Sequence, residues 1–376
     1  MPLAFLLRPS TAAAAAAAAT AAAAFFLLRI RRPPTNRRFF SSLRSAMDGC
    51  RNSTLLVISA KSPEEDVLAR SLISKSRTLK LGDEEEIRVL LGSEVDSTNH
   101  STFAAQLYME ALSASRFGRF LIWSPRLSST HDLVTKNFHD LPLGTVCLAD
   151  IQFKGRGRAK NVWESPAGCL LFSFTLQMED GHKLPFLQYV VSLALTEAIK
   201  ELCRAKGLTQ LDVRIKWPND IYLNGLKVGG ILCTSTYRSK CFNVCAGIGL
   251  NVDNEKPTTC LNAALQEVKS TSHGLKREEI LAYFFNKFEN LLEIFLNQGF
   301  QVLEELYCTT WLHSGQKVVI QEKHEGQPVE DTVVTIQGLT SSGYLLATDE
   351  DNKTYELHPD GNSFDFFKGL VRRKME

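Results

Sequence analysis

The segment Val213-Arg214-Ile215-Lys216-Trp217-Pro218-Asn219-Asp220-Ile221-Tyr222-Leu223 of this 376-residue chain has two short apolar runs joined by a polar corner. The lysine directly follows the first run, and the Trp-Pro step after it is conformationally restricted. Asn224-Gly225 is a typical hairpin turn, and Lys227-Val228-Gly229-Gly230-Ile231 returns as a further strand. The pattern predicts paired strands that keep the positively charged lysine side chain at a fixed place. A β-hairpin without a function explains the pattern equally well.

Apolar runs on both sides of this segment predict an α+β fold. Further strands are expected at 120–123, 144–149, 170–176, 230–233 and 242–245, and long helices at 186–203 and 276–297. After Trp311, short strand-like runs alternate with glycines, which predicts a small all-β barrel. The chain is therefore divided into a larger α+β domain at 116–312 and a barrel at 313–376. Residues 48–115 are expected to form a small N-terminal module of unknown role, with short strands at 55–58 and 87–91 and a helix at 64–73.

Residues 1–47 contain seven arginines and no lysine, aspartate or glutamate. An arginine-rich, serine-containing and acid-free start is typical of a mitochondrial or chloroplast transit peptide. A membrane anchor at 12–28 is the alternative, but this segment barely reaches the length of about 20 residues that spans a bilayer, and its alanines are only weakly apolar. Met47 follows directly, so initiation there would yield a second, cytosolic form. We expect no membrane association of the mature protein.

Without the transit segment, 36 of the 43 basic residues remain against 41 acidic ones, a net charge of about −5. This balance gives no electrostatic case for nucleic-acid binding. The nine cysteines are scattered without a Cys-x-x-Cys pair, which indicates reduced thiols in a reducing compartment. Cys241 and Cys245, with Cys233 nearby, are a weak candidate for zinc because no partner pair has ligand spacing.

Two further clusters have the residue types of a ligand site. Gly155-Arg156-Gly157-Arg158 follows a predicted strand and leads to Trp163. Glycine lets backbone N–H groups approach an anion closely, and arginine supplies planar, permanently charged donors. A solvent-exposed basic turn without a function would have the same residues. Gly247-Ile248-Gly249-Leu250-Asn251 lacks the spacing of a dinucleotide fingerprint and predicts a strand exit that offers an asparagine to a ligand.

Together, these clusters resemble the biotin–protein ligases, also called holocarboxylase synthetases, in their plant, organelle-targeted form. The order of the Gly-Arg-Gly-Arg segment, Trp163, Lys216 to Asp220, the Lys227 to Leu232 segment and Gly247 to Asn251 is the family's order. The resemblance covers about 120 to the C-terminus. It implies a mixed sheet flanked by helices, as in class II synthetases and lipoyl ligases, followed by an SH3-like barrel.

The family also has a Ser-Thr-Asn step that contacts biotin, some 26 residues before the first glycine of Gly-Arg-Gly-Arg. Asp96-Ser97-Thr98-Asn99 matches the residues of this step better, but it lies 58 residues before Gly155. Ser129-Thr130 has the family's spacing, although His131 stands where the family has asparagine. Spacing fixes a position in a fold better than one letter does, so Ser129 and Thr130 are the expected pair.

The resemblance implies ATP-dependent ligation of biotin, through biotinyl-5′-AMP and with Mg²⁺, to a lysine of the biotin carboxyl carrier domains of carboxylases. Acetyl-CoA carboxylase is the first candidate partner, with methylcrotonyl-CoA carboxylase as another. The site residues that it implies follow from the motifs, and it implies no particular metal ligands. The implied catalytic residues are Lys216, Arg156 and Arg158. The implied biotin-binding residues are Ser129, Thr130, Gln152, Gly155, Arg156, Lys216, Gly229 and Gly230. The implied adenylate-binding residues are Arg156, Arg158, Trp163, Lys216, Asn219 and Asn251.

Three alternatives remain. A lipoyl or octanoyl ligase would share the fold but not these motifs. A non-enzymatic biotin sensor is disfavoured because 48–115 has no three-helix DNA-binding pattern. A degenerate scaffold would not be expected to retain both the Gly155–Arg158 and the Lys216–Asp220 clusters.

Overall fold

The computed structural model describes residues 53–74, 79–81, 86–94, 103–158, 161–268, 274–322, 330–359, 362–365 and 369–373. The expected transit segment, Met47 and the alternative Ser97-Thr98-Asn99 step lie outside these residues.

The described part of the catalytic region is built on one mixed sheet, as predicted. Its nine strands follow the order β2-β1-β3-β4-β5-β9-β8-β7-β6. The pairs β1–β2 and β3–β4 are parallel, and the other neighbours are antiparallel. The strands are β1 (Ser53–Ala60), β2 (Glu86–Leu91), β3 (Phe120–Ser124), β4 (Val146–Ala149), β5 (Cys169–Met178), β6 (Val213–Lys216), β7 (Asp220–Leu223), β8 (Leu226–Arg238) and β9 (Cys241–Asn251).

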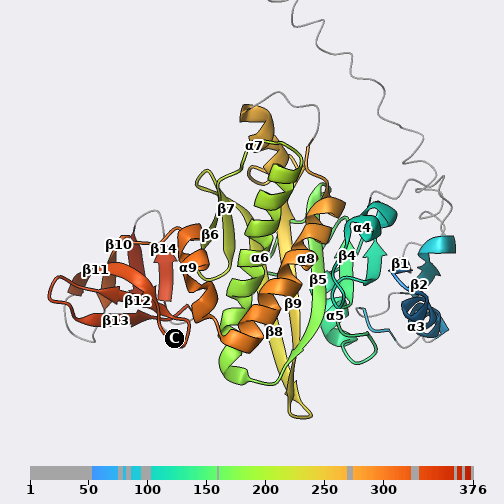
Figure 1. Ribbon diagram of the computed structural model, residues 1–376, viewed down its shortest axis with the longest axis horizontal. Helices are drawn as coiled ribbons and strands as arrows, with labels where there is room; N and C mark the ends of the chain where they lie inside the picture. Colours follow the sequence, from blue (N-terminus) through green and yellow to red (C-terminus); the bar gives the residue numbers. More distant parts are fainter. Residues whose placement is uncertain are drawn as a thin grey trace, which may run out of the picture. The chain divides into compact units, whose positions relative to one another are not determined.

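Two long helices, α6 (Leu184–Ala205) and α8 (Arg277–Gln298), pack side by side against the sheet (Figure 1). Both were predicted, and both are followed by a glycine with positive φ, Gly207 and Gly299. The described residues also form shorter helices, of which only α3 was predicted. They are α3 (Pro63–Ser74), whose core at 64–73 was expected, and α4 (Ala105–Ala111), α5 (Thr130–Lys136), α7 (Leu261–Val268) and α9 (Gln301–Thr310), with 3₁₀ turns at Gly92–Glu94 and Gly181–Lys183.

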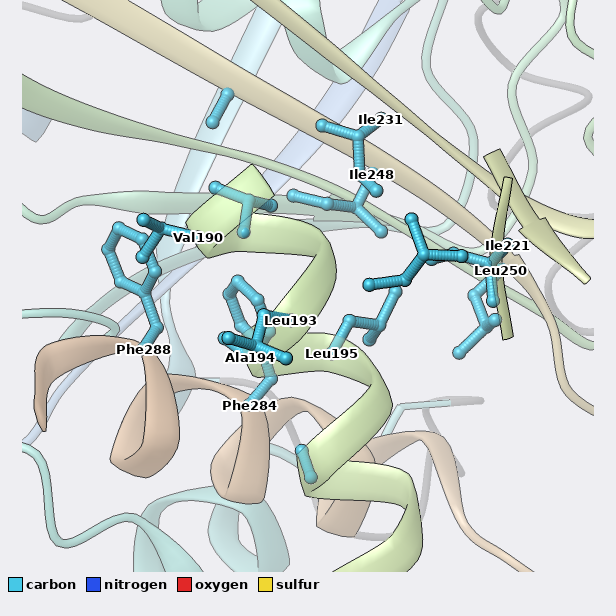
Figure 2. Close-up of a cluster of buried hydrophobic side chains, with 14 of the residues drawn as sticks. Val190, Leu193, Ala194, Leu195, Ile221, Ile231, Ile248, Leu250, Phe284 and Phe288 are labelled. Atoms are coloured by element: carbon cyan, nitrogen blue, oxygen red, sulfur yellow. The ribbon is translucent and has the colours of Figure 1, made fainter. Parts of the chain in front are cut away.

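The core lies between α6, α8 and one face of the sheet. Figure 2 shows side chains of α6, such as Ala194 and Leu195, between sheet residues Ile248 and Leu250 on one side and Phe284 and Phe288 of α8 on the other. A fully buried side chain of this size contributes about 1.5–3 kcal/mol relative to an exposed one. Because side chains alternate along a strand, every second residue of β5 and β9, and of β8 from Gly229 onward, faces this core, and the residues between them face the other side.

The opposite face of the sheet is covered in part by α3 and α5. Leu133 and Val134 of α5 pack with Cys147, Ala149 and Cys245 of the sheet. The expected module at 48–115 contributes to this layer, since β1 pairs with β3 across the expected boundary at residue 116. The described residues of that segment therefore extend the catalytic sheet and do not form a separate body.

The C-terminal residues form a second, all-β sheet, in agreement with the expected barrel. Its strand order is β13-β12-β11-β10-β15-β14. The strands are β10 (Lys317–Glu322), β11 (Glu330–Leu339), β12 (Leu345–Thr348), β13 (Thr354–Leu357), β14 (Asn362–Asp365) and β15 (Leu370–Arg373). The last two were not predicted. Within the described ranges, no helix combines the length and the apolar character needed to cross a bilayer.

Candidate active site

A cleft of about 710 Å³ lies over the sheet face opposite α6 and α8. Its floor follows from strand alternation, because Cys245, which packs against α5, is followed on the same face of β9 by Gly247, Gly249 and Asn251. Ser173 of β5 pairs with Gly247, and Gly230 of β8 pairs with Gly249. Because glycine has no side chain, the rings of Trp163 and His131 can approach the backbone of the floor closely at these places.

One wall of the cleft comes from the start of α5 and from Gln152. Ser129 caps the helix through its Oγ, which accepts from the Asp132 N–H at 3.3 Å. Gln152 Oε1 accepts from the Thr130 N–H at 2.7 Å and from its hydroxyl at 3.0 Å, and Thr130 Oγ1 lies 2.9 Å from Ser173 Oγ. The wall is thus a connected set of neutral donors and acceptors that matches a neutral polar ring.

The glycine-arginine loop closes on itself as a small hairpin. Trp163 N–H donates to Gly155 O at 3.0 Å, and Gly157 N–H donates to Asn161 O at 2.8 Å. A Cβ on Gly155 would lie 2.5 Å from Trp163 O, so the hairpin needs glycine there. Arg156 pairs with Asp132 (Nε–Oδ1 3.0 Å), which ties the hairpin to α5.

The opposite wall is the corner after β6. Lys216 and Asn219 line the cleft there. Asn219 Oδ1 accepts from Arg158 at 3.1 Å, and Asn219 Nδ2 donates to Ile231 O at 2.7 Å. This asparagine therefore connects the arginine hairpin to the edge of the glycine floor.

Trp163 lies over the floor. A Cβ on Gly249 would be 2.5 Å from Trp163 Nε1, and one on Gly230 would be 3.3 Å from Cζ3. The Lys227 ammonium lies 5.4 Å from the indole centroid. Trp163 Nε1 is buried and has no hydrogen-bond partner among the described residues, which is unusual for an indole donor.

His131 lines the same cleft as a neutral imidazole. Its Nε2 lies 2.9 Å from Thr234 Oγ1, and its Nδ1 lies 3.4 Å from Cys245 Sγ. Burial lowers the pKa of His131 to about 4. Burial also raises the pKa of the Cys245 thiol, which therefore stays protonated. This histidine connects α5 to both floor strands without adding charge.

The charged side chains that line the cleft are mostly cationic. Arg156, Arg158, Lys216 and Lys227 line it, with Asp220 and Glu164 as the acids. Asp220 is engaged by Lys227 (Oδ1–Nζ 2.7 Å). A net positive cleft in a chain whose body is mildly acidic indicates an anionic ligand. Among the described residues, no group of three or more His, Cys, Asp or Glu side chains could hold a metal ion, which includes the cysteines considered for zinc.

Comparison with known proteins gives the same picture. The Biotin/lipoate A/B protein ligase family model matches residues 123–251, and the Biotin protein ligase C terminal domain model matches 313–369. The chain is 60% identical to Biotin–protein ligase 2 of Arabidopsis thaliana over 332 residues, which are 88% of this chain and 100% of that protein. The chain belongs to the biotin–protein ligase family.

Other biotin–protein ligases agree with this membership. The one named "Biotin–protein ligase 1, chloroplastic", also of Arabidopsis thaliana, is 60% identical over 89% of this chain and 92% of its own length. The solved structure of the biotin protein ligase from Aquifex aeolicus in complex with biotin and ATP superposes with a TM-score of 0.52 at 26% identity, covering 68% of this chain and 99% of that one. The expected fold is that of its relatives.

Most residues that the biotin–protein ligase motifs singled out meet in the one cleft. The residues that line it are Ser129, Thr130, Gln152, Arg156, Arg158, Trp163, Lys216, Asn219, Gly230 and Asn251. Gly155 and Gly229 are not among its lining residues. Gly155 is required by the tight packing of the hairpin. Gly229 faces the core, where a Cβ would lie 3.2 Å from Ile221 Cβ. Alternation along β8 separates Gly229 from Gly230, so only the second can be approached from the cleft.

Asn251 reaches the cleft at the end of β9, but its amide is engaged by the segment that follows the strand. Its Nδ2 donates to Thr258 Oγ1 at 3.2 Å and to Thr259 O at 3.1 Å. Sequence reasoning missed Gly247, Gly249 and His131 as lining residues, although strand alternation back from Asn251 marks the two glycines. It also missed barrel residues that reach the cleft, for which the sequence had no signal. These are Leu345, Leu357, His358, Pro359 and Val371.

Proposed function

We propose that the cleft of this biotin–protein ligase performs both steps of ATP-dependent biotin ligation. In the first step, the biotin carboxylate attacks the α-phosphorus of ATP, which forms biotinyl-5′-AMP and releases pyrophosphate. In the second, a lysine amine of a carrier domain attacks the activated carbonyl and AMP leaves. The observation that carries this proposal is the convergence of Arg156, Arg158 and Lys216 on one glycine-floored cleft.

Lys216, Arg156 and Arg158 are the proposed catalytic residues. The negative charge on the phosphate grows and redistributes as the new P–O bond forms, so fixed cations beside it stabilise the transition state. Lys216 is a compact charge at the end of a strand, whereas the arginines offer planar, two-pronged donors. No enzyme nucleophile is needed, and the buried cysteines keep the raised pKa values of unreactive thiols.

The wall formed by Ser129, Thr130 and Gln152 is the proposed site of the ureido ring of biotin. A ureido group has both donors and an acceptor, and this wall holds hydroxyl and amide groups of both kinds. The ring would lie near Gly230, where Trp163 covers the floor, with Gly155 closing the hairpin that carries Arg156. Gly229 faces the core, so it would affect biotin binding only indirectly, through the backbone path of β8 next to Gly230.

The adenylate is proposed to lie between the hairpin and the corner after β6. Arg158 and Asn219 are already joined by a hydrogen bond of 3.1 Å, so they can close over a phosphate as a unit. Trp163 has a buried indole donor for the ligand. Asn251 would act by holding the segment of Thr258, which lines the cleft, near the adenine or ribose.

Mg²⁺ is proposed to arrive with ATP and not to occupy a site of its own. The described carboxylates form no cluster, and Asp132 and Asp220 are paired with cations. Mg²⁺ bound through phosphate oxygens and water suits such a cleft, because it keeps several waters and needs few protein ligands.

The proposed acceptors are the carrier domains of biotin-dependent carboxylases. Acetyl-CoA carboxylase is the first candidate, and methylcrotonyl-CoA carboxylase is the second. Chloroplast import is the favoured localisation, because a relative at 60% identity is named chloroplastic and residues 1–47 are rich in arginine without acids. Mitochondrial import and a cytosolic form that starts at Met47 are the further options. Fluorescent fusions of the full chain and of a chain starting at Met47 separate these: identical localisation of the two contradicts a second form.

Adenylation can be tested without a carrier. The purified full chain is mixed with biotin, ATP and Mg²⁺, and pyrophosphate and biotinyl-5′-AMP are quantified by enzyme-coupled assay and mass spectrometry. One equivalent of pyrophosphate per chain, dependent on biotin and accompanied by bound biotinyl-5′-AMP, is expected. Lipoate or octanoate in place of biotin serves as the control, and a preference for either would assign the cleft to the related lipoyl ligases.

A further inference from the structure

His313 stands where the catalytic domain passes into the barrel, and it contacts the residue next to Lys216. Its side chain has no exposed surface. Its Nε2 accepts from the backbone N–H of Trp217 at 2.9 Å, and its Nδ1 lies 3.0 Å from Gln316 Oε1. The acceptor at Nε2 requires the tautomer with its proton on Nδ1, which donates to Gln316. Burial lowers the pKa of His313 to about 4, so the ring is neutral at physiological pH.

The indole of Trp217 connects the same corner to the barrel by a second route. Its Nε1 donates to Tyr189 Oη at 2.8 Å, and Tyr189 donates onward to Gly343 O at 2.5 Å. Tyr189 lies on α6, and Gly343 lies in the turn between β11 and β12. The backbone adds a third contact, since Leu312 N–H donates to Ile215 O at 2.9 Å.

These contacts fix both of the residues that adjoin Lys216 in the sequence. Ile215 before it is held by Leu312, and Trp217 after it is held by His313 and Tyr189. His313 is itself fixed to the barrel, because Gln316 N–H donates to His313 O and Gln316 O accepts from Ile336 of β11 at 2.9 Å. A lysine side chain is flexible, so its placement at a reacting phosphate depends on how well its own backbone is fixed.

We propose that His313 is a positioning residue for Lys216, through which the C-terminal barrel contributes to the rate of biotin adenylation. The proposal rests on the proposed function, because it concerns the step in which Lys216 acts. His313 touches no substrate. It acts by accepting the Trp217 N–H and thereby fixing the peptide that joins Trp217 to Lys216.

Two replacements of similar polarity separate positioning from general stability. In His313→Gln, the amide oxygen can stand at the same number of bonds from the backbone as Nε2, so it can accept the Trp217 N–H. In His313→Asn, the amide reaches only the place of Nδ1 and leaves that N–H without an acceptor. Tyr189→Phe keeps the ring and removes the second connection. Each variant is made in the full chain, and its unfolding midpoint is measured beside its kinetics.

The measurement is biotin-dependent pyrophosphate release, with kcat and the KM values for biotin and ATP determined separately. We expect His313→Asn to lower kcat about 10- to 100-fold, because small misplacements of a catalytic group cost about that much, with both KM values within about threefold. We expect His313→Gln to stay within about threefold of the natural chain. Tyr189→Phe should lower kcat by a smaller factor.

The outcomes that overturn the proposal are distinct from failure of the proposed function. Equal kcat in the Asn and Gln variants overturns it, as does a loss confined to KM. If the Asn variant does not fold, Tyr189→Phe decides, and an unchanged kcat there overturns the coupling. If the natural chain itself releases no pyrophosphate with biotin, the proposed function fails and the positioning role fails with it.

Discussion

At the scale of single residues, the site depends on the positions of its glycines as much as on the positions of its charged side chains. Gly230, Gly247 and Gly249 make room on the floor for the Trp163 and His131 rings, and Lys216 and the two arginines line the cleft around them. His131 meets the floor at Gly247, where a Cβ would come within 2.9 Å of its Nδ1. A methyl group on the floor should therefore disturb the ligand site more than it disturbs the fold.

Gly249→Ala tests this floor. The added Cβ would lie 2.5 Å from Trp163 Nε1, so the tryptophan and its hairpin must shift. Overpacking of this kind costs about 1–3 kcal/mol, and we expect this cost to appear in biotin binding as a Kd about 5- to 150-fold higher. Isothermal titration calorimetry with biotin measures the change. Gly338→Ala, whose Cβ would come no closer than 3.7 Å to another group, is the matched control. Equal affinity in both variants would contradict the role of the floor.

At the scale of elements, the glycine-arginine hairpin is the part placed to retain the adenylate. Replacing Arg158 with glycine removes the donor to Asn219 and the charge beside the phosphate. Charge-assisted hydrogen bonds contribute about 1.5–3 kcal/mol, so biotinyl-5′-AMP should dissociate about 10-fold faster or more. The half-life of the bound adenylate, followed by rapid filtration, gives this rate. Arg126→Ala is the control, because Arg126 stacks on exposed Phe153 away from the cleft lining. An unaltered half-life in Arg158→Gly would refute the assignment.

The N-terminal strands provide a second element-scale prediction. β1 covers the backbone edge of β3, and Leu56, Ile58 and Leu72 close the core beside α5. A chain that starts at residue 103 would expose this edge and its apolar face, and unpaired edges of this kind promote aggregation. Size-exclusion chromatography with light scattering should find aggregates for that chain and none for one starting at Met47. A soluble 103–376 chain with an unchanged unfolding midpoint would contradict this role.

The elements also indicate how far the sequence alone predicts the molecule. Long helices and alternating strands are local patterns, so α6, α8 and the strands around Lys216 were predictable. Helix α5 spans only Thr130–Lys136, too short for its periodicity to stand out. The pairing of β1 with β3 and the contact of His313 with Trp217 join residues that are distant in the chain. Such contacts depend on tertiary packing, which no local pattern encodes.

At the scale of the whole molecule, two buried histidines make stability depend on pH. Burial lowers the pKa of both His131 and His313 to about 4, below the ordinary value of 6.5. Between these values the unfolded chain binds protons that the folded chain does not, so stability falls as pH falls from about 6.5 towards 4.

The expected loss between pH 7.5 and pH 5 is about 2 kcal/mol for each histidine. Urea unfolding at the two pH values measures it. A chain with both His131→Asn and His313→Gln lacks these groups and should lose about 4 kcal/mol less over the same interval. The same pH dependence with and without the histidines would show that they are not buried as neutral rings.

The central claim, that this cleft transfers biotin to a carrier lysine through Lys216, has one direct test. The full chain is incubated with labelled biotin, Mg²⁺, ATP and an apo carrier domain, and the label on the carrier is measured over time. We predict ATP-dependent label on the acceptor lysine, a rate at least about 100-fold lower for Lys216→Ala, and a normal rate for exposed Lys154→Ala. Absence of ATP-dependent label on the carrier, or an unchanged rate in folded Lys216→Ala, would contradict the claim.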